Sequence, residues 1–535
     1  MISGGLEFDD HPAAGDLFSP ESVCFLIELE NRFGPGRNDL LTARADRHRS
    51  LDAGSRLTYQ AETEPIRRRQ WTVAAPPKDL EDRRVEMTGP PEPAAMIDGL
   101  NSGAQVYMAD FEDACSPTWA NVLAGHESIR AFHRGELTTV RNGRSISPVD
   151  DPATLIVGVR AWQQTESHVR IDGRPMSASL FDFGLAAFHC ARASLDAGSG
   201  PYFSLPKIEC HLEARLWADV ISETESFLGL DRGSIRVTVL VETILAAFEM
   251  DEILFELKDH ACGLNAGRSD YLFSIAKTFR NDPDYVLPDR VDIRMEVPFM
   301  RAFGELLVST CHRRGTHAIG GVSAAIPGAK DPRTRRCALE RVTADKRREA
   351  GDGFDGTLVA HVETVPFARA EFDRVLGDRP NQLEVQRDDV YITAGDLLSV
   401  RSTRGSITPD GVRADIRVGI RYLSAWLGGR GSVAVDHTMI DASAAEFSRA
   451  QLWQWIRHEA ELSNGQILTP EICLALIDDE AAAIRAEVGD PGWTTGRYEE
   501  ARRLFKRLVL SDEFAEFLTL PAYELIRTHP QEPRS

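Results

Sequence analysis

The sequence is short of positive charge. Its 535 residues include 61 Lys and Arg against 82 Asp and Glu, which gives a net charge of −21. Binding to nucleic acid requires a basic surface that neutralises phosphates, and binding to an anionic membrane requires one too. The composition therefore predicts that neither is a partner. An anionic substrate must find local cations against an unfavourable overall field.

Long apolar runs and paired cysteines are also missing. No stretch approaches the roughly 18 apolar residues that a membrane span needs, and the first residues, MISGGLEFDDHP, are polar and acidic. The eight cysteines contain no CxxC pair, which is typical of free thiols in a reducing compartment. The glycine-rich segment Gly428–Gly431 follows a helical pattern and not a strand, so it does not indicate a dinucleotide site. We predict a cytoplasmic protein.

What the sequence does have is an alternation of short apolar strands with helical stretches. This alternation indicates a parallel sheet covered by helices, and the number of strands fits a (β/α)8 TIM barrel. The boundaries that we predict are an N-terminal helical region over 1–95, a barrel over 96–378 and a C-terminal helical domain over 379–535. The clearest strands are Val106–Ala109, Leu155–Val159, Tyr202–Leu205, Arg236–Val241, Ala261–Leu264, His317–Gly320 and Gly356–Ala360.

The segment Val239–Phe273 places one carboxylate after each of two strands. Its pattern is strand, helix, strand; Glu242 follows the first strand, and Asp270 follows the second through a turn that contains Gly267. Neighbouring parallel strands end side by side, about 5 Å apart, so the two carboxylates can reach one divalent cation. Two carboxylates that leave room for water and substrate suit Mg²⁺. The alternative is two solvated loop acids.

Several motifs resemble the shorter, A-type class of malate synthases. The resemblance covers nearly the whole chain with little sign of insertion or deletion. The segments that carry it are LEDRRVEMTGP (Leu80–Pro90), MADFEDACSPTW (Met108–Trp119), SLFDF (Ser179–Phe183), GSGPYFSLPK (Gly198–Lys207), KDHACGLNAGRSDYLF (Lys258–Phe273), FSRAQLWQWIRH (Phe447–His458) and SDEFAEFLTLPAY (Ser511–Tyr523).

The resemblance implies a fold and a reaction. It implies the same barrel, clasped by an N-terminal helical segment and covered at its mouth by a C-terminal helical plug. It also implies an acyltransferase of the glyoxylate cycle that condenses acetyl-CoA with glyoxylate and then hydrolyses the thioester. The cofactor implied is Mg²⁺, and the partners implied are acetyl-CoA and a 2-oxo acid.

The resemblance also assigns roles to individual residues. Glu242 and Asp270 match the two Mg²⁺ ligands, and Asp441 matches the base that removes the methyl proton. On the sequence alone, a cap for the helix that follows is the favoured role of Asp441, and the resemblance reverses that preference. A group of acids after the Val106–Ala109 strand is expected to hold water molecules around the metal, although it could be a solvated cluster at the barrel rim: Asp110, Glu112 and Asp113.

Some positions depart from the family pattern. Gly158 stands where the family has its catalytic arginine, and Arg160 matches the second arginine of that motif. Since Arg160 lies two residues further along a predicted strand, we expect it on the same face, displaced by roughly 6–7 Å and able to substitute in part. Ser269 replaces a tryptophan and Ile440 replaces a glutamate. Together with Gly267, these two residues are expected to line an altered substrate pocket.

Three readings remain open. The first is a working malate synthase, with or without Arg160 as a substitute for the missing arginine. The second is a related Claisen or retro-Claisen enzyme that acts on another 2-oxo acid or on a malyl-CoA-like thioester. The third is a non-catalytic paralogue that binds CoA or a metal. Retention of Glu242, Asp270 and Asp441 together argues against the third reading.

Overall fold

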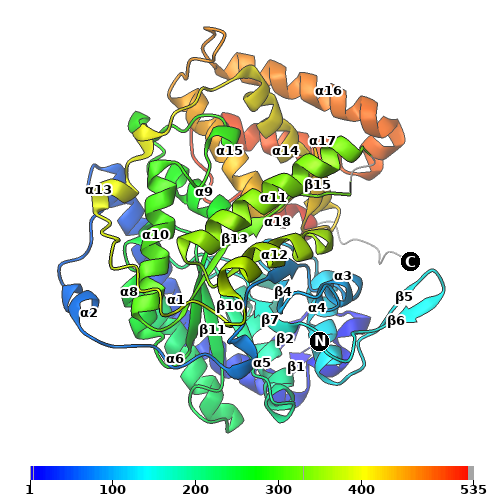
Figure 1. Cartoon of the computed structure of the whole chain (residues 1–535). Helices are drawn as coiled ribbons and strands as arrows, with labels where there is room; N and C mark the ends of the chain where they lie inside the picture. The colour runs from blue at the N-terminus through cyan, green and yellow to red at the C-terminus, as the bar shows by residue number, and fades with distance from the viewer. Residues whose placement is uncertain (1, 4, 329–330, 528–535) are drawn as a thin grey trace.

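A closed barrel of eight parallel strands forms the centre of the protein. In this computed structural model, which describes residues 2–3, 5–328 and 331–527, the strand order around the barrel is β10-β11-β12-β13-β14-β3-β4-β7 (Figure 1). The predicted (β/α)8 fold class is therefore confirmed. The strands are β3 (Glu86–Gly89), β4 (Val106–Asp110), β7 (Thr154–Gly158), β10 (Tyr202–Leu205), β11 (Arg236–Val241), β12 (Ala261–Ala266), β13 (His317–Ser323) and β14 (Gly356–Val359).

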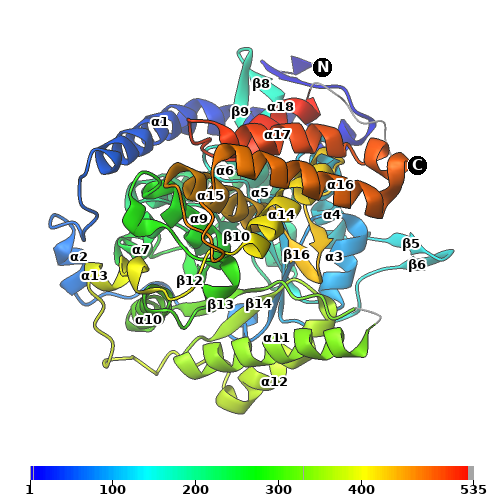
Figure 2. The same cartoon turned by 90° about the horizontal axis from the view of Figure 1, so that it is seen from above.

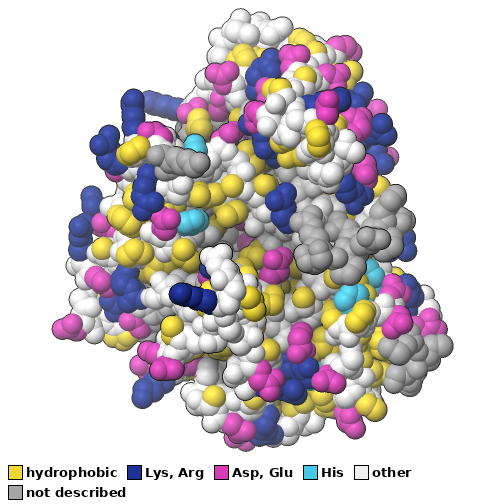
Figure 3. Space-filling model, turned by 90° about the vertical axis from the view of Figure 1, so that its right-hand side faces the viewer, with side chains coloured by type: hydrophobic (Ala, Val, Ile, Leu, Met, Phe, Trp, Pro, Cys, Tyr) yellow, Lys and Arg dark blue, Asp and Glu magenta, His cyan; other side chains and the backbone are white. Residues whose placement is uncertain are grey.

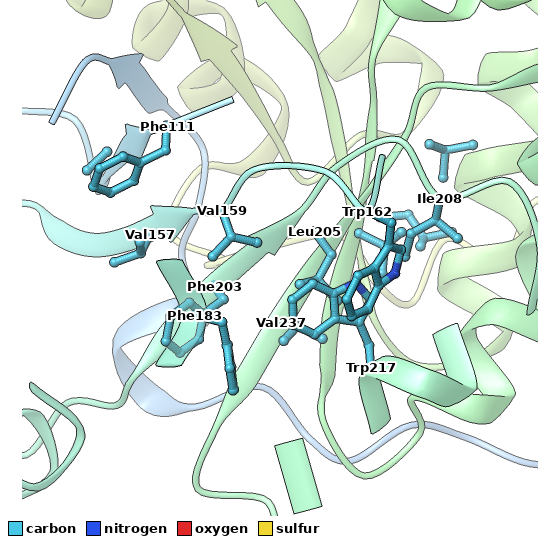
Figure 4. Packing of buried hydrophobic residues seen from close by; sticks show 14 of the residues in the cluster. Phe111, Val157, Val159, Trp162, Phe183, Phe203, Leu205, Ile208, Trp217 and Val237 are labelled. Carbon is cyan, nitrogen blue, oxygen red and sulfur yellow. The ribbon is translucent and has the colours of Figure 1, made fainter. Parts of the chain in front are cut away.

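The barrel strands are apolar on both faces. All residues of β11 and β12 are buried, as expected for parallel strands that are covered by helices. One set of side chains, which includes Val106, Met108 and Ile156, forms a small cluster of its own, and the residues that alternate with it join a much larger cluster. Figure 4 shows part of the large cluster, where the rings of Trp162 and Trp217 lie 4.3 Å apart between their centroids. The side chains therefore hold each strand between two apolar layers.

Helices follow the strands and cover the outside of the barrel. Figures 1 and 2 show them arranged around it. They are α3 (Pro93–Leu100), α4 (Trp119–His133), α5 (Ala178–Asp196), α6 (His211–Leu228), α7 (Ile244–Ala247), α8 (Met250–Glu256), α9 (Arg268–Thr278), α10 (Pro298–Arg313), α11 (Pro332–Asp352) and α12 (Val365–Leu376).

The sequence pattern reveals seven of the eight barrel strands, and the eighth is β3. It lies within residues 1–95, the region predicted to be helical and irregular, and it pairs with β4 on one side and β14 on the other. The short strand begins with a charged residue, Glu86, which is buried because the Arg83 guanidinium donates to it over 2.5 Å. A strand of four residues that opens on a glutamate gives no apolar pattern to detect.

The N-terminal region is dominated by the long helix α1 (Pro20–Asp52). Ser19 caps it by accepting from the Ser22 N–H, and Pro20 occupies the first turn, where its missing N–H costs nothing. The helix runs along the outside of the barrel (Figure 2). Its Arg44 forms a buried ion pair of 2.6 Å with Glu213 of α6. The expected helical clasp is therefore present.

The C-terminal helices build a second apolar core beside the barrel. This core contains Trp426, Trp455 and Phe505 among its largest members. The helices lie across the barrel in the view of Figure 2, and α15 packs directly on α9. The elements are α13 (Ala394–Leu397), α14 (Pro409–Leu427), β15 (Val433–Val435), β16 (Thr438–Ile440), α15 (Ala442–Arg457), α16 (Pro470–Thr495), α17 (Tyr498–Leu510) and α18 (Thr519–Arg527).

The surface carries charges of both signs. On the face in Figure 3, Lys and Arg side chains are scattered among Asp and Glu side chains. In the described part of the chain, no helix is long and apolar enough to cross a membrane.

Candidate active site

Glu242 and Asp270 lie side by side at the carboxyl ends of two neighbouring barrel strands. Strands β11 and β12 pair in parallel, with Val241 opposite Ala266, so the chain leaves both strands at the same edge. Glu242 follows β11 directly, and Asp270 lies in the first turn of α9. Both side chains are buried. A side chain at Gly267 would collide with Glu242, since an added Cβ would lie 2.3 Å from its Cγ. Glycine is therefore required at this turn.

A third carboxylate, that of Asp113, joins this pair. One oxygen from each of Asp113, Glu242 and Asp270 lies within 4.8 Å of the others. Three carboxylates, with no sulfur or imidazole among them, are the donor set of a hard cation such as Mg²⁺. The residues therefore fit the implied metal. Asp113, which we expected only to hold water molecules around the metal, lies among the groups that could bind it.

The other two acids after β4 shape the loop that holds Asp113. Asp110 Oδ1 accepts from the N–H groups of Glu112 (2.9 Å) and Asp113 (3.2 Å), which folds the chain back on itself. Glu112 Oε2 accepts from the Ala161 N–H over 2.8 Å and from the Gln164 side chain. Both residues thus fix the position of Asp113, and their role in holding water stays a prediction.

Lys207 is a residue of the site that sequence reasoning missed. Its Nζ lies 3.0 Å from Asp113, 3.2 Å from Glu112 and 3.3 Å from Asp270, while its backbone N–H donates to Glu242 over 2.9 Å. Burial lowers the pKa of Lys207, but the surrounding carboxylates outweigh burial and raise it well above its ordinary range. The sequence feature that could have identified Lys207 is its place two residues after β10, at the end of the GSGPYFSLPK motif.

The carboxylates of the site hold protons more tightly than free side chains do. Burial raises the pKa of Glu242 from its ordinary value of 4.5 to about 8; Lys207 opposes this shift and Asp113 adds to it. Burial and then Asp113 raise the pKa of Asp270 well above its ordinary range. The negative charges are therefore incompletely balanced by Lys207 alone, which favours a further cation at the site.

This imbalance predicts that Mg²⁺ stabilises the protein more at higher pH. Between pH 4.5 and about 8, Glu242 keeps a proton in the metal-free fold that the unfolded chain releases. The metal-free protein therefore loses stability as pH rises through this interval, whereas a metal that binds ionised carboxylates binds more tightly. The gain in melting temperature on replacing EDTA by Mg²⁺ should grow over this interval. A gain that is constant or shrinks would contradict the prediction.

Asp441 both caps α15 and reaches the site. Its Oδ1 accepts from the Ala444 N–H (3.0 Å) and from Ser443 Oγ (2.7 Å), and the Ala442 N–H donates to the Asp113 carbonyl over 3.4 Å. Burial and then Asp113 raise the pKa of Asp441. The two readings of this residue from the sequence are therefore compatible. A half-buried carboxylate with a raised pKa beside a carboxylate cluster is suited to accept a proton.

The structure holds Arg160 in a buried ion-pair network and not among the carboxylates of the site. Its guanidinium is fully buried; Nε and Nη2 each donate to Asp182 over 2.8 Å, and Nη1 lies 2.8 Å from Glu166. The expectation assumed that the strand continues, but β7 ends at Gly158, so alternation no longer places residue 160 on the inner face. At Gly158 itself, an added Cβ would lie 3.2 Å from Asp110 Cα.

The two altered pocket positions have different surroundings. Ile440 is 3% exposed and packs in the C-terminal apolar core beside α15, and its place in the substrate pocket stays a prediction. Ser269 is half-buried beside Asp270, and its Oγ accepts from Nη2 of Arg290 over 3.3 Å. The small residue at position 269 thus leaves space that an arginine enters.

Comparison with known proteins identifies the family. Residues 154–400 match the malate synthase TIM barrel domain and residues 406–526 match the malate synthase C-terminal domain. A malate synthase of Streptomyces clavuligerus is 49% identical over 96% of both chains. Malate synthase A of Escherichia coli (strain K12) is 44% identical over 95% of this chain and 96% of its own. We conclude that the chain belongs to the malate synthase family.

Proposed function

We propose that this protein is a transferase of the glyoxylate cycle that condenses acetyl-CoA with glyoxylate and hydrolyses the thioester to give malate and CoA. The observation that carries the proposal is the meeting of Asp441, from the C-terminal helices, with the barrel carboxylates Asp113, Glu242 and Asp270. A proton acceptor beside a cation site is what this reaction requires. Family membership supports the same assignment.

The mechanism follows from the chemistry of the acetyl group. Asp441 removes a proton from the methyl carbon, and the C–H electron pair forms the enolate. The enolate carbon attacks the aldehyde carbon of glyoxylate, a C–C bond forms, and the carbonyl oxygen takes a proton. Water then attacks the thioester carbonyl, the C–S bond breaks, and CoA leaves as the thiol. Because the base, Asp441, caps α15, the packing of α15 on the barrel brings the base to the metal site and completes it.

The residues assigned to the metal are Asp113, Glu242 and Asp270, and the metal is Mg²⁺. When bound, it supplies Lewis acidity to the glyoxylate carbonyl. Lys207 keeps Asp113 and Asp270 close together, and Asp110 and Glu112 keep the loop of Asp113 folded. In this proposal, residues 1–95 clasp the barrel, 96–378 carry the metal site and 379–535 supply the base, with β3 contributed from the first segment. The location proposed is cytoplasmic.

The direct test is release of free CoA, measured with a thiol reagent, from acetyl-CoA and glyoxylate with Mg²⁺ or with EDTA. We expect turnover that depends on Mg²⁺ and that yields malate by mass spectrometry. If no 2-oxo acid gives Mg²⁺-dependent release, the proposed function fails, and the non-catalytic reading replaces it.

The small residues at positions 158 and 269 favour a second candidate function. Gly158 and Ser269 are smaller than the arginine and tryptophan of the family pattern, so a larger 2-oxo acid, or a malyl-CoA-like thioester in the reverse direction, is the second candidate substrate. The same assay with a panel that includes pyruvate and longer 2-oxo acids decides between the two. If glyoxylate is turned over best, at ordinary malate synthase rates, the second candidate is wrong.

A further inference from the structure

Forming an enolate at Asp441 requires a positive group at the thioester oxygen. Negative charge develops on that oxygen as the methyl proton leaves, and a donor placed there accelerates such steps by about 10²–10³. Gly158 carries no side chain to supply one. Another basic residue near Asp441 can supply this donor.

Most basic residues around the site are already held by carboxylates. Each of the following is within ion-pair distance of at least one: Arg160 (Asp182 and Glu166, both 2.8 Å), Lys207 (Asp113, 3.0 Å), Lys277 (Glu516, 3.4 Å) and Arg449 (Glu446, 2.7 Å). A guanidinium or ammonium group that is neutralised in this way has little charge left to offer a developing anion.

Arg290 is different. It lies between the first turns of α9 and α15, where Nη2 donates to Ser269 Oγ (3.3 Å) and Nη1 donates to the Ala444 carbonyl (3.2 Å). The guanidinium also lies 5.9 Å from the ring centroid of Phe447. Within 2–3, 5–328 and 331–527, no carboxylate forms an ion pair with it. Both of its hydrogen-bond acceptors are uncharged, and the carboxylates of Asp415 and Asp441 act on its charge only from beyond ion-pair distance.

The position of Arg290 relates it directly to the base. Ala444 contacts both residues: its N–H donates to Asp441 and its carbonyl accepts from Arg290. Asp441 and Arg290 are thus attached to the same turn of α15. In acetyl-CoA the carbonyl oxygen is only two bonds from the methyl carbon. A substrate whose methyl group faces Asp441 therefore has its oxygen on a side that a flexible arginine can reach.

We propose that Arg290 is a catalytic residue whose guanidinium donates a hydrogen bond to the enolate oxygen of acetyl-CoA, through the space that Ser269 leaves. The inference rests on the proposed function. As Asp441 takes the methyl proton, the C–H electron pair becomes the C=C bond, the carbonyl π pair moves to oxygen, and Arg290 stabilises that oxygen without transferring a proton.

The test compares Arg290→Met with Arg457→Met. Arg457 is exposed at the far end of α15, and its guanidinium lies 5.9 Å from the ring centroid of Trp453, which matches the ring contact of Arg290. We expect Arg290→Met to lower kcat by about 10²–10³, with the KM for acetyl-CoA little changed, and to slow deuterium exchange into the acetyl-CoA methyl group in D2O equally. Arg457→Met should behave as the parent enzyme.

A second variant separates catalysis from folding. Gly158→Arg in the Arg290→Met background should raise kcat at least tenfold over that of Arg290→Met alone, because it supplies a guanidinium from β7. The inference is overturned if Arg290→Met keeps the parental kcat and the parental rate of deuterium exchange. It is also overturned if Arg290→Met lowers both activity and melting temperature and Gly158→Arg restores no activity. Parental enzyme without any turnover would overturn the proposed function instead.

Discussion

Replacing Asp441 by asparagine should reduce kcat/KM for CoA release by about 10²–10⁴, the usual contribution of a positioned general base. Asparagine keeps the side-chain oxygen that accepts from the Ala444 N–H, and asparagine caps helices about as well as aspartate. It cannot accept the methyl proton. The variant should therefore fold, bind Mg²⁺ and bind acetyl-CoA, but fail to exchange the methyl protons with D2O.

Asp441→Ala provides the matched comparison. Alanine removes both the proton acceptor and the cap, and loss of a cap costs about 1 kcal/mol. We expect the two variants to be equally inactive but to differ in melting temperature. In the parent enzyme, burial and Asp113 raise the pKa of Asp441, and only the ionised form accepts a proton. Activity should therefore rise with pH through this pKa. An active Asp441→Asn variant would remove Asp441 from the mechanism.

The carboxylate pair that we propose as metal ligands could be predicted from the sequence because its geometry depends on local patterns. Glu242 and Asp270 follow two apolar strands that a helix connects, and parallel neighbours must end at one edge. Asp113 joins the same carboxylate cluster, but pairing between neighbouring strands does not place it there. It follows β4, which is not adjacent to β11 or β12. No sequence pattern gives the distance across the mouth of a barrel, so its place beside Asp270 could only be found in the structure.

The basic residues of the site could not be predicted for a related reason. Whether a lysine or arginine is available depends on long-range partners, which sequence spacing does not encode. Arg160 matched a family position yet is held by Asp182 and Glu166. Lys207 and Arg290 lie in connecting segments after β10 and α9, where periodicity carries no information. The positive φ of Lys207, +52°, also reverses the chain locally, which its residue type does not suggest.

Replacing Arg160 by methionine should destabilise the protein by about 3–5 kcal/mol, the usual cost of removing one partner from a buried ion pair. Asp182 and Glu166 are both fully buried around Arg160. Burial raises the pKa of Asp182, but Arg160 outweighs it and lowers this pKa to about 2. Methionine would leave two buried carboxylates without their main cation, and each would have to take up a proton or admit water.

The measurement for Arg160→Met is the free energy of unfolding in urea, followed by tryptophan fluorescence, since Trp162 lies two residues away. Arg141→Met is the control, because the ion pair of Arg141 with Asp98 lies at the surface and contributes little. Since buried carboxylates must be protonated in the variant, its loss of stability should shrink as pH falls toward the ordinary carboxyl range. If both variants lose equally little stability, the ion pairs of Arg160 with Asp182 and Glu166 do not hold it in place, and Arg160 would be free to turn toward the site.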